Sequence, residues 1–124
     1  MKISGKTQLM GLIGWPVSHS FSPAMHNAAA ADLGLDFVYL ALPVHPDDVE
    51  TAVRGLPALG FRGFNITVPH KQAIMLLLDE IEAGARAIGA VNTVVISKQY
   101  SVNSEQSPIV NRQSKIVNLK GYNT

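Results

Sequence analysis

Short apolar runs alternate with helix-like segments along this chain, and that alternation constrains the fold more than any other feature. The apolar runs cover residues 9–14, 37–42, 61–68 and 90–96, and each is typical of a buried strand. Helical segments are predicted from Ser22, from Pro46, from Pro69 to Leu78 and over residues 81–88. Strands that alternate with helices form layered domains with parallel sheets. We therefore predict an α/β domain of three layers, with a mainly parallel sheet flanked by helices.

Local signals mark the ends of two of these helices. Ser22 is a residue type that caps helices, and Pro23 suits the first helical position. Gly34 and Gly89 follow helical stretches, where glycine commonly ends a helix. These signals predict where the chain leaves one layer and enters the next.

Composition excludes several classes of protein. The 124 residues suit one domain, and a hydrophobic content of 47% is that of a globular protein. A net charge of +1 offers no electrostatic basis for binding nucleic acid or an anionic membrane. Residues 74–78, the longest apolar run, are far too few to span a bilayer, and the N-terminus lacks the apolar core of a signal peptide. We expect a soluble cytoplasmic protein.

Motifs for metals and nucleotides are absent from these residues. Cysteine does not occur, and the four histidines show no metal-binding spacing, so we expect no metal site. Neither GxGxxG nor GxxxxGK[ST] is present, so no dinucleotide or P-loop fingerprint occurs.

Polar residues lie where three of the predicted strands begin or end. They are Ser20, Ser22, Thr67, Lys71 and Asn92. Ligands of open α/β sheets bind beyond the carboxyl ends of the strands, so these groups are predicted to share one pocket. Hydroxyl, amide and ammonium groups suit a small polyhydroxylated carboxylate. Each residue also has a structural interpretation: Ser22 as a cap, Ser20 as a loop residue, Asn92 as a turn residue and Lys71 as a surface lysine.

Lys71 is the most informative of these residues. It falls in the first turn of the helix predicted from Pro69, where the helix dipole disfavours a positive charge. Because a positive charge is unfavourable at this position, the presence of Lys71 there indicates a functional role.

Residues 97–120 have a different character. Three related units of seven residues, QYSVNSE, QSPIVNR and QSKIVNL, begin at Gln99, Gln106 and Gln113. A helix with a seven-residue repeat fits poorly, because the units are rich in Asn, Ser, Val and Ile and Pro108 interrupts them. We expect a surface loop, and pairing as extra strands remains open.

The motifs GWPVSHSFSPAMHN, GFNITVPHK and GAVNTVV occur in this order between residues 14 and 95, and the chain closes on GYNT. Their order and spacing resemble the N-terminal, substrate-binding domain of shikimate dehydrogenases. The resemblance implies a domain core at residues 1–96, an inserted loop at 97–120 and the start of the family's next motif at 121–124. It also implies NADP-dependent, reversible oxidation of shikimate to 3-dehydroshikimate in aromatic amino-acid biosynthesis.

The resemblance also assigns roles by position. Ser20 and Ser22 would bind the shikimate carboxylate, Thr67 and Asn92 would contact the substrate, and Lys71 would be the catalytic lysine. In the family an aspartate follows the final Asn-Thr pair, whereas this chain ends at Thr124. We therefore expect the isolated chain to bind no NADP and to be inactive alone.

Other interpretations of the same residues stay open. One is a non-catalytic module that binds shikimate or quinate, and another is a truncated gene product. In either case we expect the face left by a missing NADP domain to permit self-association.

Overall fold

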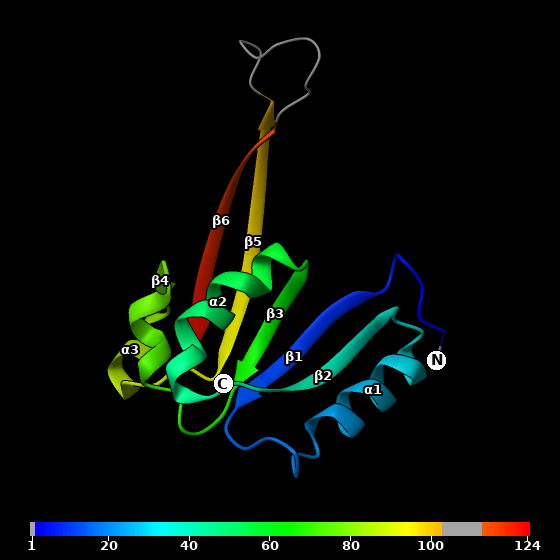
Figure 1. Cartoon of the computed structure of the whole chain (residues 1–124), viewed down its shortest axis with the longest axis horizontal. Coiled ribbons are helices and arrows are strands. Elements are labelled where there is room, and N and C mark those ends of the chain that lie inside the picture. The colour runs from blue at the N-terminus through cyan, green and yellow to red at the C-terminus, as the bar shows by residue number, and fades with distance from the viewer. Residues whose placement is uncertain (1, 103–112) are drawn as a thin grey trace.

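The computed structural model describes residues 2–102 and 113–124 (Figure 1). Its strands are β1 (Gln8–Gly14), β2 (Phe37–Pro43), β3 (Phe61–Ile66), β4 (Glu80–Ile81), β5 (Thr93–Val102) and β6 (Gln113–Tyr122). Its α-helices are α1 (Ser22–Leu33), α2 (Val49–Ala58) and α3 (Ala83–Ile88), and two 3₁₀ helices cover Pro46–Asp48 and Ala73–Leu77. The described part of the chain contains no helix with the length and apolar character of a membrane span.

The strands form one mixed sheet in the order β2-β1-β3-β5-β6-β4. Strand β1 pairs in parallel with β2 and β3, and β4 pairs in parallel with β6. Strand β5 runs antiparallel to both of its neighbours, β3 and β6. Among the described strands, five therefore point the same way and β5 alone is reversed. The predicted α/β domain with a mainly parallel sheet is confirmed.

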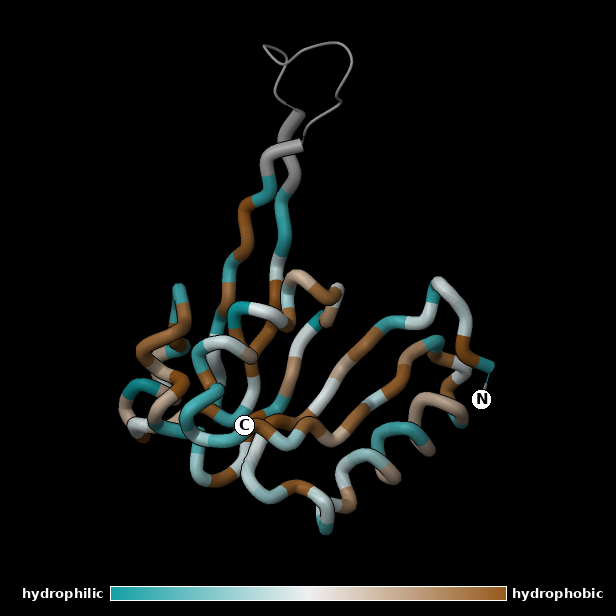
Figure 2. Tube along the Cα trace, viewed as in Figure 1, coloured by the Kyte–Doolittle hydropathy of each residue, from teal (hydrophilic) through white to brown (hydrophobic). Residues whose placement is uncertain are grey.

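Apolar residues cover both faces of the sheet, because successive side chains of a strand point to opposite sides. Leu12 of β1 packs with Tyr39 on the face that α1 covers, next to β2. Ile13, the next residue, belongs to the larger core that includes Val53 of α2 and Phe64 of β3. Figure 2 shows apolar residues concentrated along β1 and β2. Helix, sheet and helix thus form the three predicted layers.

The predicted ends of two helices are confirmed. Gly34 ends α1 with a φ of 67° and Gly89 ends α3 with a φ of 79°, both in the left-handed region that glycine adopts readily. The α3 helix starts later than predicted because residues 80–81 form β4 and Glu82 caps the helix by accepting a hydrogen bond from the Ala85 backbone N–H.

The helix predicted from Pro69 is not present. Lys71 lies in a turn, and only the 3₁₀ helix Ala73–Leu77 follows it. The Lys71 carbonyl accepts a hydrogen bond from the Val91 N–H at 2.9 Å, so a distant segment takes the place of a helical partner. The argument from the helix dipole therefore does not apply to Lys71.

Both ends of the repetitive segment are strand rather than loop. Residues 97–102 continue β5 and residues 113–120 belong to β6, in a register that is unbroken from Thr93↔Tyr122 to Val102↔Gln113. β-Branched residues such as Ile116 and Val117 favour such a ribbon over a loop. The two arms project well beyond the body of the domain (Figure 1). The middle of the repeat, residues 103–112, lies outside the described residues.

Candidate functional site

The site is built where β1 and β3 end side by side. The Thr67 N–H donates to the Ile13 carbonyl at 2.9 Å, and the Trp15 N–H donates to the Val68 carbonyl at 3.2 Å. The loop that follows β1 and the loop that follows β3 are therefore joined by backbone hydrogen bonds. The side chains of these two loops therefore lie at the same edge of the sheet.

A cavity of about 300 Å³ lies at this edge. Its lining residues are Leu12, Pro16, Val17, His19, Ser20, Ser22 and Thr67. Three of the five predicted site residues thus meet in one hollow, although they come from two motifs far apart in the chain. The lining combines three apolar residues, three residues that carry hydroxyl groups and His19, and it contains no acidic residue.

The two serines differ from the prediction in their local roles. Phe21, not Ser22, precedes the first turn of α1, and it makes no side-chain cap. The Ser20 Oγ instead accepts a hydrogen bond from the Ser22 N–H at 3.1 Å. The prediction that Ser22 caps the helix is therefore wrong, because the helix begins at Ser22 itself. Among the described residues its hydroxyl has no hydrogen-bond partner, which leaves it available to a ligand.

Lys71 and Asn92 do not belong to the lining of this cavity. Lys71 is half-buried and forms no ion pair with any described residue. The Ile66 N–H donates to the Asn92 carbonyl at 2.8 Å, which fixes Asn92 beside the end of β3. The side chain of Asn92 reaches Thr124, with its Nδ2 3.0 Å from the Thr124 carbonyl oxygen. The last described residues therefore return to the same edge of the sheet.

Metal ligands are not gathered here or elsewhere in the described part of the chain, where no group of three His, Cys, Asp or Glu side chains lies together. The chemistry of the described site rests on hydroxyl, amide and ammonium groups.

Comparison with known proteins shows the family of this chain. A family model described as the shikimate dehydrogenase substrate binding domain matches residues 12–94. The chain belongs to this family. Its shikimate dehydrogenase relatives include the NADP(+) enzyme of Rubrobacter xylanophilus, which is 55% identical over 101 residues, or 82% of this chain and 36% of the relative. The enzyme of Desulforamulus reducens is 50% identical over 99% of this chain and 36% of its own length.

Solved shikimate dehydrogenases share the fold. The Aquifex aeolicus enzyme is 39% identical with a TM-score of 0.79, and the alignment covers 98% of this chain and 39% of that one. The Listeria monocytogenes enzyme, solved with shikimate and NAD, is 38% identical with a TM-score of 0.78 and covers 98% and 36%. The chain spans about a third of the length of the relatives it matches.

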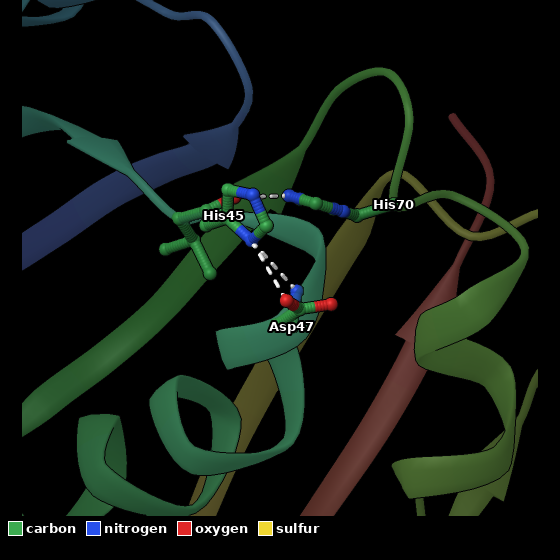
Figure 3. A network of polar contacts seen from close by, with 4 residues as sticks. His45, Asp47 and His70 are labelled. Carbon is green, nitrogen blue, oxygen red and sulfur yellow. Dashed lines mark hydrogen bonds and ion pairs between the residues drawn. The ribbon is translucent and has the colours of Figure 1, made fainter.

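His70 has a structural role that the sequence did not indicate. It lies between Pro69 and Lys71 in the shikimate dehydrogenase motif GFNITVPHK, it is 1% exposed, and its Nε2 lies 2.6 Å from the Val44 carbonyl oxygen (Figure 3). Since a carbonyl only accepts, Nε2 carries a hydrogen and donates it. His45, beside Val44, accepts from the Asp47 N–H at 3.1 Å. The His70 ring thus holds the Lys71 turn against the end of β2.

Tyr39 is the second residue that sequence reasoning missed. It is 1% exposed and stacks on His26 of α1 at 4.3 Å between ring centroids. The Asn27 side chain bonds both the N–H and the carbonyl of Tyr39, at 2.8 and 2.9 Å. Burial raises the pKa of the Tyr39 phenol to about 12. Tyr39, which lies in an apolar strand, therefore joins α1 to the sheet, and no spacing in the sequence predicts this role.

A methyl group at Gly14 should damage the cavity of this shikimate dehydrogenase domain. A Cβ there would collide with the Thr67 methyl group and would lie 2.8 Å from the Val17 Cγ1, and both residues line the cavity. We expect Gly14→Ala to lower the free energy of unfolding by about 1–3 kcal/mol, as overpacking does, measured by urea denaturation. Gly55→Ala, in α2 with open space around it, is the matched control and should be neutral or stabilising. Equal effects of the two substitutions would contradict the close packing at Gly14.

Proposed function

We propose that this chain is the substrate-binding part of an NADP-dependent shikimate dehydrogenase, a cytoplasmic enzyme that oxidises shikimate reversibly to 3-dehydroshikimate in aromatic amino-acid biosynthesis. The observation that carries the proposal is the cavity in which Ser20, Ser22 and Thr67 meet. Its volume of about 300 Å³ suits a small molecule rather than a macromolecule. The Listeria monocytogenes relative, which was solved with shikimate, supports this assignment.

The serine hydroxyl groups are suited to a carboxylate. The Ser20 Oγ accepts from the Ser22 N–H, so its own hydrogen is free to be donated. The Ser22 hydroxyl has no partner among the described residues. In the proposal both hydroxyl groups donate to the shikimate carboxylate, and such charge-assisted hydrogen bonds are stronger than neutral ones.

Lys71 is proposed as the catalytic residue. Its ammonium group would donate a hydrogen bond to the hydroxyl group that reacts and would assist its proton transfer. Thr67 and Asn92 would orient the ring through its other hydroxyl groups. The Val91–Lys71 backbone hydrogen bond and the buried His70 ring keep the backbone of the Lys71 turn next to the segment that carries Asn92, which supports the proposal.

The nucleotide is not assigned to residues of this chain. NADP would supply the hydride acceptor, and its binding commonly relies on a glycine fingerprint that these 124 residues do not contain. We therefore expect the 124-residue chain to bind shikimate without oxidising it. Turnover of shikimate with NADP by this chain alone would contradict that expectation.

A binding module without turnover is the second candidate. The cavity, which the described residues form by themselves, is compatible with it, and quinate is then an alternative ligand. Pairing between copies of the chain is part of this candidate and is checked by sedimentation at several concentrations.

Titration of the chain with shikimate, followed by NMR of backbone amides, tests the proposed ligand. We expect saturable shifts around Ser20, Ser22 and Thr67, and an affinity that falls about 10–100-fold in Ser22→Ala, the range for one charge-assisted hydrogen bond. Ser18→Ala is the control, since Ser18 is exposed in the same loop and does not line the cavity. Absence of shifts at millimolar shikimate in the wild-type chain would sink the proposal, and tighter binding of quinate would favour the second candidate.

A further inference from the structure

A continuous series of side-chain hydrogen bonds runs across the sheet to Asn92. The Tyr39 hydroxyl lies 2.8 Å from the Asn65 Oδ1. The Asn65 Nδ2 lies 3.1 Å from the Thr93 Oγ1, and that hydroxyl lies 2.9 Å from the Asn92 Oδ1. Tyr39, Asn65 and Thr93 are not among the site residues predicted from the sequence.

Backbone groups decide the direction of the first two bonds. The Asn65 amide also lies 3.3 Å from the Asn92 carbonyl oxygen, which only accepts, so the atom on that side is Nδ2. Its Oδ1 therefore faces Tyr39, and the phenol donates. The Thr93 hydroxyl accepts from the Asn65 Nδ2, and it donates to the Asn92 Oδ1 because an amide oxygen only accepts.

Backbone groups also decide the orientation of the Asn92 amide. The Thr124 N–H must donate, and it lies 3.1 Å from the Asn92 Oδ1. The Thr124 carbonyl must accept, and it lies 3.0 Å from the Asn92 Nδ2. The Thr124 hydroxyl lies 3.2 Å from the same Oδ1. Oδ1 is thus surrounded by three donors, whereas Nδ2 has one described acceptor and keeps one hydrogen free.

Reversal of the amide would be unfavourable. It would place the Asn92 NH₂ group against the Thr124 N–H, and it would set two carbonyl oxygens face to face. Each such contact replaces a hydrogen bond by repulsion between like groups.

We propose that Thr93 and Tyr39 are positioning residues that hold Asn92 so that it presents an amide N–H, and not its carbonyl oxygen, to the ligand. The ligand atom at Asn92 is then an acceptor, which is an oxygen of a hydroxyl, carbonyl or carboxylate group. The inference deepens the proposed function and rests on it for the identity of the ligand.

Tyr39 also contacts the helix that begins at Ser22. Its ring stacks on His26, and its backbone is held by Asn27, both in α1. One buried tyrosine thus connects the helix that carries Ser22 with the hydrogen bonds that end at Asn92.

The test compares Thr93→Val with Thr93→Ser in the 124-residue chain, because valine has a similar shape without the hydroxyl and serine retains it. Without ligand, the Asn92 Nδ2 proton that is bonded to the Thr124 carbonyl should exchange slowly with solvent in the wild type, as measured by NMR. We expect faster exchange of this proton in Thr93→Val, recovery in Thr93→Ser, and no effect of Thr51→Val, an exposed site in α2. Unchanged Asn92 signals in Thr93→Val would overturn the positioning role.

Shikimate supplies the second arm of the test. We expect about tenfold weaker binding to Thr93→Val than to the wild type or Thr93→Ser, the effect of one hydrogen bond. In the wild type the ligand should shift only one Asn92 Nδ2 proton, the one that is not bonded to Thr124. A shift of neither proton while the Ser22 amide responds would overturn the assigned polarity.

If the wild type does not bind shikimate at all, the proposed function fails, while the experiment without ligand still decides the positioning. If Thr93→Val does not fold, the wild-type Asn92 signals decide the orientation: exchange of both Nδ2 protons with solvent as fast as in an exposed asparagine would overturn it.

Discussion

Lys71→Met should lower the kcat for shikimate oxidation by about 10³-fold, within the range measured for the loss of a general acid–base group. Methionine retains the length and apolar stem of lysine but can neither carry a proton nor donate a hydrogen bond. The assay needs an NADP-binding part, which is supplied by joining this chain to the remainder of a relative such as the Rubrobacter xylanophilus enzyme. Initial rates with saturating shikimate and NADP measure the effect.

Binding and turnover must be separated in that experiment. We expect shikimate affinity to fall far less than kcat, since an interaction made mainly in the transition state affects kcat most. Lys6→Met, at an exposed position before β1, is the control for loss of a charge. A kcat for Lys71→Met within tenfold of the parent would remove the catalytic role, and a loss of affinity with kcat unchanged would make Lys71 a binding residue only.

His70→Ala should lower the free energy of unfolding by about 3–5 kcal/mol. The substitution empties a fully buried position and leaves the Val44 carbonyl without its donor at 2.6 Å, so a cavity cost and an unpaired polar group combine. Urea denaturation followed by circular dichroism measures it.

Two further variants help to interpret the loss of stability in His70→Ala. His70→Phe keeps an aromatic ring but loses the donor, and we expect it to cost about 1–3 kcal/mol. His45→Ala removes a side chain that accepts from the Asp47 N–H near the surface, and about 1 kcal/mol is expected there. If His70→Ala costs no more than His45→Ala, the buried hydrogen bond contributes nothing to stability.

Three of the strands and the ends of two helices could be predicted from the sequence. Apolar runs with helix-like segments between them predicted β1, β2 and β3 to within two residues, and glycine predicted the ends of α1 and α3. The meeting of Ser20, Ser22 and Thr67 followed from a general property, because parallel strands bring their carboxyl ends to one edge of the sheet.

The parts that were not predictable depend on distant partners. Pro69 signals a helix start locally, but the Lys71 carbonyl is taken by Val91, and residues 113–120 became a strand because β5 lies beside them. His70 and Tyr39 acquire their roles from the carbonyl of Val44 and the amide of Asn65. Periodicity reports which face of an element is apolar, but it does not report which polar group a buried side chain will meet.

The length of the β5–β6 ribbon can change without a change in the geometry of the site at its base. Its base is the pair Thr93↔Tyr122, next to Asn92 and Thr124, and its arms are paired residue by residue as far as Val102↔Gln113. Residues added or removed in equal numbers on the two arms would change the reach of the ribbon and leave the base in register. An odd change on one arm would turn every following side chain to the opposite face. The ribbon is therefore suited to carry an affinity tag or a spectroscopic label, placed far along the chain from the binding groups, provided that its arms change as a matched pair.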